Sequence, residues 1–490
     1  MPTSATGPTT RCASTRAELR RPRDRRRRQS RRHPARRASS SPAPADALNT
    51  DSIDNSAGVD CSDHEVNIKI ALGAEVLAGR LDGPARDTLL AEMTDAVAAL
   101  VLTDNRLQAQ ALSLAEAQGL AATPRFQRLL QTLEARGGLD RRVEGLADDA
   151  SISRSAAAGQ GFTRPELAVL MAYAKMALTA ALSAPEAAPL LDDPALEPDL
   201  LAAFPTPMPA RFAEAIRSHR LKRELIATEL ANELVNRGGL PLAFELAEAR
   251  SASLVDVAAA FVTVRDLFGI RALWAALDDP AISAQQQLAL HLHAREALAT
   301  HMADVLRYAP GRSPATLITT LAASVTRLGE ALEGLLGPEP RRSHDTAAAR
   351  LTALGAPAPL ATRLLRLESL DGAIGIGIIA SENGLDDLAL ARAYARLGEV
   401  DRARLGTRRR QGAATRRPLG AAAPVQPRPG LRKPAPHPSG AALQARRRAR
   451  RNARSLARRQ QQQRRPPRRH HQPRPQQRPR HTRHARPSRQ

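Results

Sequence analysis

A helical hydrophobic pattern over roughly 300 residues after Gly73 constrains the fold of this chain more than any other feature. Alanine and leucine dominate it and β-branched runs are scarce, which favours amphipathic helices of period 3.6. Leu90, Met93 and Val97 recur at three- and four-residue steps and place one apolar stripe inward. The sequence therefore predicts a mainly α fold, with a packed multi-helix domain over residues 73–400.

Two helices have readable ends. Thr163 and Glu166 form a Ser/Thr-x-x-Glu capping box with Pro165 in the first turn, so a helix should begin there. A second helix is expected from about residue 209 to residue 236 and should end at the glycines that follow it. Further helices are expected around residues 260–277, 285–306 and 314–336.

Both ends of the chain differ sharply from this middle. Residues 1–47 contain thirteen basic and three acidic residues, a net charge of +10, and residues 401–490 contain 28 and one, a net charge of +27. Since the whole chain carries +24, the stretch between them carries −13. The ends are rich in Arg, Pro, Gln and His and poor in large apolar residues, so we expect both to be disordered.

The arginine clusters admit two explanations. They could neutralise phosphates, which makes a nucleic-acid-binding protein the alternative function and nonspecific binding an expectation. Against specific recognition stand the acidic middle and the lack of aromatic residues for stacking between the arginines. A shifted reading frame in GC-rich DNA explains them more economically, because only four of the 73 basic residues are lysines. Translating the neighbouring DNA in the other frames tests this hypothesis.

The remaining composition favours a cytoplasmic protein. Cys12 and Cys61 lie in different segments and cannot form a disulfide framework or a four-ligand zinc site by themselves. No apolar run reaches the roughly 20 residues that span a bilayer, and no apolar segment follows the N-terminal arginines as in a secretory signal. We therefore expect no membrane segment and no metal.

Four blocks of sequence point to a known family. They read LNTDSIDNSAGVDCSDHEVNIKI at residues 48–70, FTRPELAVLMAYAKMAL at 162–178, HRLKRELIATELANELVNRGG at 219–239, and FGIRALWAAL at 268–277. In this order and spacing the chain resembles the C-terminal part of the large bacterial NAD-specific glutamate dehydrogenases, from about Asn49 to about Gly398. The match suggests a truncated or frameshifted fragment of such an enzyme.

The resemblance implies NAD-dependent oxidative deamination of L-glutamate to 2-oxoglutarate and ammonium. It also implies that residues 48–72 are the end of an α/β catalytic domain, that residues 73–400 are a helical C-terminal domain, and that a homo-oligomer is plausible. Glutamate dehydrogenases carry an Asn-x-x-Gly-Val-x-x-Ser loop, which Asn55, Gly58, Val59 and Ser62 resemble. By that similarity Asn55 would lie near the nicotinamide ribose of NAD and Ser62 would bind the side-chain carboxylate of glutamate.

A structural alternative exists for this motif. Asn55 and Gly58 could merely shape a turn, and Ser62 could cap the next helix. Short motifs of this kind are weak evidence on their own. Without the other blocks, the structural alternative would be preferred.

Most of a dehydrogenase site is missing from the sequence. No Gly-x-Gly-x-x-Gly follows a strand to hold a pyrophosphate. No lysine stands in a glycine-flanked catalytic context, and we expect Lys69, Lys175 and Lys222 to be solvated. We therefore assign no catalytic residue and expect the isolated chain to lack a complete active site.

Histidines and a basic cluster offer weaker candidates. His64 follows Cys61 at metal-ligand spacing, but no second ligand pair follows, so a loop or helix-start histidine is expected. Three histidines in one predicted helix are expected on its surface, namely His291, His293 and His301. The cluster at residues 219–223 could bind an anion, but a solvated face or internal salt bridges are expected instead.

Overall fold

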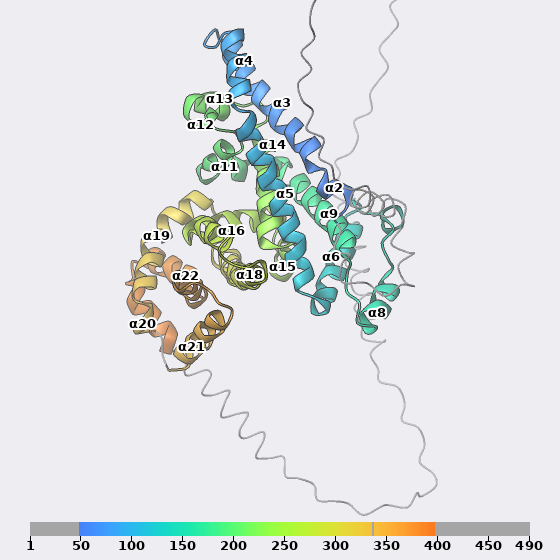
Figure 1. The fold of residues 1–490 in the computed structure, drawn as a ribbon. Coiled ribbons are helices and arrows are strands. Elements are labelled where there is room, and N and C mark those ends of the chain that lie inside the picture. Colours follow the sequence, from blue (N-terminus) through green and yellow to red (C-terminus); the bar gives the residue numbers. More distant parts are fainter. Residues whose placement is uncertain (1–48, 336–337, 397–490) are drawn as a thin grey trace, which may run out of the picture. The chain divides into compact units, whose positions relative to one another are not determined.

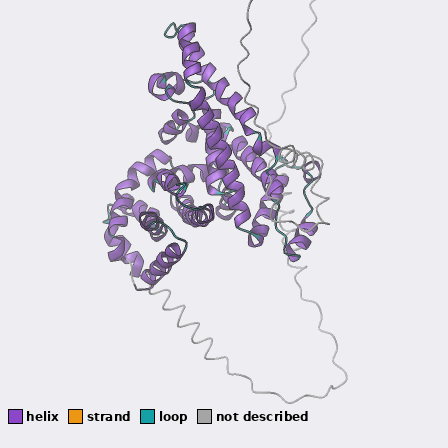
Figure 2. Ribbon diagram, viewed as in Figure 1, coloured by secondary structure: helices purple, strands orange, loops and turns teal. Residues whose placement is uncertain are grey.

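The computed structural model describes residues 49–335 and 338–396 of the chain, which form helices and loops without a strand (Figure 1; Figure 2). The longer helices are α3 (Ser56–Leu77), α4 (Gly83–Glu92), α5 (Thr94–Ala117), α6 (Thr123–Ala135), α8 (Asp149–Ala157), α9 (Arg164–Leu182), α14 (Lys222–Glu233), α15 (Leu242–Arg250), α16 (Leu254–Leu267), α17 (Ile270–Leu277), α18 (Ala284–Tyr308), α19 (Pro314–Glu330), α21 (Pro338–Ala353), α22 (Ala358–Ser369) and α23 (Ala373–Asn383). The shorter helices are α2 (Asp51–Asp54), α7 (Arg141–Glu144), α10 (Ala188–Leu191), α11 (Glu197–Ala202), α12 (Met208–Arg211), α13 (Ala213–Arg217) and α20 (Leu332–Leu335), together with the 3₁₀ turns η2 (Leu120–Ala122), η3 (Pro185–Ala187) and η4 (Pro194–Leu196) and the π-helical turn η5 (Leu234–Gly238). The predicted mainly α fold is confirmed.

The segment resembling a dehydrogenase loop is helical. α2 and α3 together cover it from Asp51 onward, so the expectation of a loop between Asn55 and Ser62 is wrong. Ile68 and Leu72 of α3 are buried and α3 packs on α5 and α13, so tertiary contacts stabilise a helix that the small polar residues at its start do not favour. No strand of an α/β domain lies among the described residues.

The core is built around α16 and α18. α16 starts with a Ser253–Asp256 capping box, and it packs on α9, α15, α17, α18 and α19. Because it has neighbours on several sides, residues on all of its faces are buried, as the consecutive buried residues Phe261, Val262, Thr263 and Val264 show. α18 packs in turn on α5, α15, α17, α22 and α23. A helix enclosed in this way loses the single apolar stripe by which sequence recognises surface helices.

α9 begins as predicted and is the most membrane-like helix of the described part. The capping box of Thr163 and Glu166 is present, and the helix runs from Arg164 to Leu182. By length and composition alone, α9 is long and apolar enough to cross a bilayer. No run of this kind was expected from the sequence. It packs on α5, α6, α14 and α16 through buried residues such as Leu170 and Leu178. A core helix passes the same test, so we treat α9 as one.

The helix expected over residues 209–236 is wrong in its first half. The chain there forms α12, α13 and α14, with a break at Phe212 between the first two and a turn at residues 218–221 before α14. The Nδ1 atom of His219 accepts a hydrogen bond from the Leu221 amide at 3.1 Å, which replaces a helical partner and stops the helix. The predicted end is confirmed, because η5 stops at Gly239, whose φ is 104°.

The predicted disordered segments, residues 1–47 and 401–490, lie outside the described residues. The expected helix at 260–277 is divided into α16 and α17, with Gly269 at φ 59° between them. Those expected at 285–306 and 314–336 appear as α18 and as α19 with α20.

Candidate functional site

The two residues predicted to contact substrate and cofactor lie at the start of α3. Asn55 occupies the N-cap position without a side-chain capping bond, and Ser62 is exposed about two turns later. A Cβ on Gly58 would stand 3.7 Å from the Asn55 Oδ1 atom, so this turn is open enough for other residues. Both side chains face solvent, and the cavity described below is lined by other residues.

A cluster of ionisable groups lies further along the same helix. Asp60 and His64 of α3 interact electrostatically with Asp104 of α5, and Lys175 of α9 and Glu229 of α14 belong to the same set. The His64 Nε2 atom is 3.8 Å from an Asp104 carboxylate oxygen. His64 was expected in a loop or at a helix start, but it lies in the third turn of α3.

Burial shifts several of these groups toward their neutral forms. It lowers the pKa of Lys175 to about 8 and raises the pKa of Glu229 to about 7, the latter with help from Asp104. Burial and Asp104 also raise the pKa of Asp60. The nearby Asp104 carboxylate raises the pKa of His64 against its desolvation. The expectation that Lys175 is solvated is wrong in part, because α9 packs on α5 and α14 and leaves this side chain only partly exposed.

A cavity of about 410 Å³, lined by ionisable and apolar residues, adjoins this cluster. Its wall includes Asp104, Glu229, Asn236 and Trp274. The residues come from α5, α11, α14, η5 and α17, helices that are far apart in sequence. Asn236 is buried and its side-chain oxygen has no hydrogen-bond partner.

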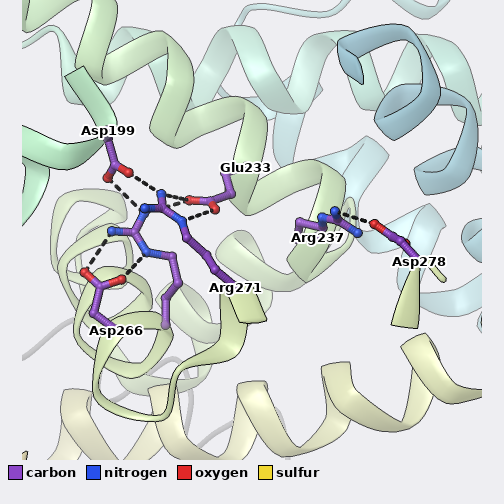
Figure 3. Close-up of polar contacts among 7 residues, drawn as sticks. Asp199, Glu233, Arg237, Asp266, Arg271 and Asp278 are labelled. Carbon is purple, nitrogen blue, oxygen red and sulfur yellow. Dashed lines mark hydrogen bonds and ion pairs between the residues drawn. The ribbon is translucent and has the colours of Figure 1, made fainter. Parts of the chain in front are cut away.

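Arginines form ion pairs with carboxylates in and beside the wall of this cavity, and Figure 3 shows these pairs. Arg265 has no exposed side-chain surface and forms ion pairs with Asp199 at 2.9 Å, Glu233 at 2.7 Å and Asp266 at 2.7 Å. Arg271 contacts Asp199 and bonds Glu233 at 2.9 Å. Burial would raise the pKa of Glu233, but the two arginines outweigh it and lower that pKa. The guanidinium groups are thus occupied by internal partners and are not free to bind an anion.

Asp278 is a second centre of polar contacts. Its carboxylate accepts from Arg237 at 2.7 Å, from Gln110 at 2.8 Å and from His291 at 2.9 Å. These bonds outweigh desolvation and hold the pKa of Asp278 well below its usual range. The Arg237 guanidinium also lies 5.3 Å from the centre of the Trp274 ring, in a cation–π arrangement. This set joins α5, η5, α17 and α18.

The expectation of surface histidines on α18 is wrong. His291, His293 and His301 are all buried. His291 bonds Asp278, His293 lies 3.1 Å from Glu368, and His301 bonds the Leu367 carbonyl at 2.8 Å and stacks on Phe268. Burial lowers the pKa of His291 and of His301. Because α18 has helices on several sides, residues two apart are both covered.

The basic cluster at residues 219–223 forms internal contacts. Arg223 pairs with Asp192, and the Lys222 Nζ atom is 3.8 Å from the same carboxylate. His219 is buried against Phe204, and its Nε2 atom bonds the Asn67 carbonyl at 3.2 Å. The predicted salt-bridge explanation is therefore confirmed for Lys222 and Arg223.

Sequence reasoning missed the arginine networks. Arg265 stands directly after AFVTV, a mostly apolar run that is fully buried. Its place after this run was the sequence feature that could have indicated a buried arginine. A long charged side chain at a core position needs buried partners. Those partners, Asp199 and Glu233, lie 66 and 32 residues earlier in the chain, so they could not be identified without the fold.

The described residues do not fit a nicotinamide cofactor. A dinucleotide fold needs parallel strands whose glycine-rich turn leads into a helix that faces the pyrophosphate. No strand occurs in residues 49–335 or 338–396. We therefore derive no step of hydride transfer from them. A search of the same residues also finds no grouping of His, Cys, Asp and Glu suited to a metal ion, and Cys61 is an exposed free thiol.

Comparison with known proteins decides the family. Residues 159–412, more than half of the chain, match the family described as glutamate dehydrogenase, C-terminal. The chain belongs to this family. Residues 38–115 also match the catalytic domain of bacterial NAD-glutamate dehydrogenase. The second match extends to residue 115, near the end of α5. The boundary of the catalytic domain at residue 72 remains a prediction.

Three relatives of this glutamate dehydrogenase family member are named NAD-specific glutamate dehydrogenase. The Pseudomonas aeruginosa protein is 47% identical over 222 residues, 45% of this chain and 14% of the relative. The Halomonas elongata protein is 36% identical over 331 residues, which are 67% of this chain and 20% of the relative. The Mycobacterium tuberculosis protein is 35% identical over 320 residues, which are 65% of this chain and 19% of the relative. The chain thus spans at most a fifth of the length of these relatives, and the resemblance seen in its sequence is confirmed.

Proposed function

We propose that this chain is the helical C-terminal part of an NAD-dependent glutamate dehydrogenase, which oxidises L-glutamate to 2-oxoglutarate and ammonium. The observation that carries the proposal is the joint match to the catalytic-domain and C-terminal families of these enzymes, in that order along the chain. The names of the three relatives support the same activity.

The helical domain would serve as a scaffold rather than as the reaction centre. Its buried arginines are paired internally, and the described residues contain no dinucleotide fold. We infer that Asn55 and Ser62 are the points where this chain meets the reactants, Asn55 at the nicotinamide ribose and Ser62 at the glutamate side chain. Their exposure at the start of α3 leaves them open to a neighbouring domain.

The test is glutamate-dependent reduction of NAD. The purified chain should show no turnover, because its described part contains no dinucleotide fold to hold the cofactor. A chimera in which residues 49–400 replace the corresponding segment of the Halomonas elongata enzyme, which matches this chain over 331 residues, should turn over. Circular dichroism and size measurements would show that the chimera folds, and a folded chimera without turnover would refute the proposal.

Substitution of Ser62 tests the residue assignment separately. S62A in the active chimera should raise the KM for glutamate by about tenfold, because a hydrogen bond to a carboxylate is lost. C61A changes the preceding exposed residue and serves as the matched control. Equal KM values for the two variants would show that Ser62 does not contact the substrate.

Cytoplasmic location and self-association are further parts of the proposal, consistent with NAD-linked amino-acid catabolism. The nucleic-acid alternative rests on the basic ends, which lie outside the described residues. No specific observation favours that alternative.

A further inference from the structure

We propose that Arg164 is a positioning residue, which holds the segment leading to Asn55 against the helical domain. The inference rests on the proposed function for its catalytic consequence, but its geometry is independent of that function. Arg164 opens α9, where the C-terminal family match has just begun, and Asn55 lies in the stretch matched by the catalytic-domain family.

The Arg164 side chain is buried and its hydrogen-bond capacity is nearly filled. Only 8% of the residue is exposed. Its Nε atom donates to the Asn49 Oδ1 atom at 2.6 Å, one Nη atom donates to Ser113 at 3.1 Å and to Glu116, and the other donates to the Ala109 carbonyl at 3.0 Å. Four of the five guanidinium N–H groups therefore have partners on two different segments.

Arginine is an unfavourable choice at this position for α9 itself. A cation in the first turn of a helix opposes the helix dipole, and burial adds a desolvation cost. Local helix stability therefore does not explain Arg164. The contacts with α5 and with Asn49 do, because they offset both costs and connect elements that are 48 to 115 residues away in sequence.

A second tether acts on the same segment. The Asn105 side-chain amide of α5 donates to the Ile53 carbonyl at 2.8 Å, and Ile53 is itself buried. α2, which contains Ile53, also packs on α5. Asn49 and Ile53 are thus both held before the chain reaches Asn55, so the position of the α3 N-terminus depends on these contacts.

Hydrogen–deuterium exchange of the whole chain tests the tether. R164M, R164K and N49A should each raise the exchange rate of amides 51–62 by about tenfold, while those of α16 and α18 stay protected. R164K is informative because lysine keeps the charge beside Glu116 but cannot reproduce the planar fork that reaches Asn49. R128M, which removes an exposed pair with Glu248, is the matched control and should change nothing in this segment.

Unchanged exchange of amides 51–62 in both R164K and N49A would overturn the proposal, even if R164M unfolded the chain. In the active chimera, R164K should raise the KM for NAD or glutamate by about tenfold and change kcat less, since it displaces binding groups. An equal loss in kcat with unchanged KM values would also contradict positioning. If the unsubstituted chimera has no turnover, the proposed function fails, while the exchange experiment still judges the tether.

Discussion

At the scale of single residues, the described part of this protein is organised by buried charges. Arg265 is enclosed by three carboxylates, and Arg295 donates from its guanidinium to the carbonyls of Asn236 and Arg237 at 2.8 and 2.7 Å. Arg295 thereby satisfies orphan carbonyls at the end of η5, where a cation also complements the helix dipole. A buried arginine needs acceptors of this kind to offset the cost of its desolvation.

Removal of Arg265 should be strongly destabilising. R265M should lower the free energy of unfolding by about 3 kcal/mol, because Asp199 and Glu233 lose a buried counter-ion. Urea denaturation followed by circular dichroism measures this loss. The control R128M removes a pair whose side chains are 60% and 52% exposed and should change stability by less than about 1 kcal/mol. Similar losses in the two variants would contradict the assignment of a buried network.

Glu229 should make stability fall as pH rises from about 4.5 to about 7. Its folded pKa of about 7 exceeds the ordinary value of 4.5, so the folded state holds the proton more tightly in that window. The slope from one such group is at most about 1.4 kcal/mol per pH unit. Denaturation at a series of pH values should show this slope, and E229Q should flatten it; an identical pH profile for E229Q would refute the assignment.

Lys175 should act in the opposite direction at higher pH. Its pKa is lowered from 10.5 to about 8, so the unfolded chain binds the proton more tightly between those values. Stability should therefore rise with pH through this window, and K175M should remove the rise. K69M, at an exposed pair with Glu65, is the matched control. A rise that persists in K175M would show that another group causes it.

At the scale of elements, local capping signals predicted helix ends well and periodicity predicted helix lengths less well. The capping box at Thr163 and the glycine after η5 are both where the sequence placed them. The single helix expected across residues 209–236 was wrong because the buried His219 side chain supplies a partner that interrupts it. Such an interruption depends on a carbonyl of α3, 152 residues away, and no local pattern shows it.

The apolar run AIGIGIIA shows how an element depends on its neighbours. It forms the start of α23, and a Cβ on Gly377 would meet the Leu321 side chain of α19 at 2.9 Å. G377V should therefore destabilise the protein by on the order of 1–3 kcal/mol despite the higher intrinsic helix propensity of valine. G73A in α3, where a Cβ would meet nothing within 4 Å, should instead stabilise by roughly 0.5–1 kcal/mol. Thermal unfolding of both variants measures the contrast, and a stabilised G377V would contradict the close packing.

At the scale of the whole molecule, charge is divided between the middle of the chain and its ends. The middle carries −13 and the ends carry +10 and +27. Deletion of residues 1–47 and 401–490 should therefore abolish retention on heparin, because the basic clusters are removed. The same deletion should leave the midpoint of thermal unfolding unchanged if the helices pack independently of the ends. Retention by the shortened chain, or loss of its cooperative unfolding, would contradict this division.

The sequence by itself determined the helical class, the family and several helix ends, because periodicity, capping and extended motifs are local properties. Only the tertiary structure decided that Lys175 is partly buried and the histidines of α18 fully so, that Arg265 has its carboxylate partners, and that Arg164 reaches Asn49. The physical reason is that burial and ion pairing depend on which helices become neighbours. Those neighbours come from segments tens to more than a hundred residues apart, so their charges meet only after the chain has folded.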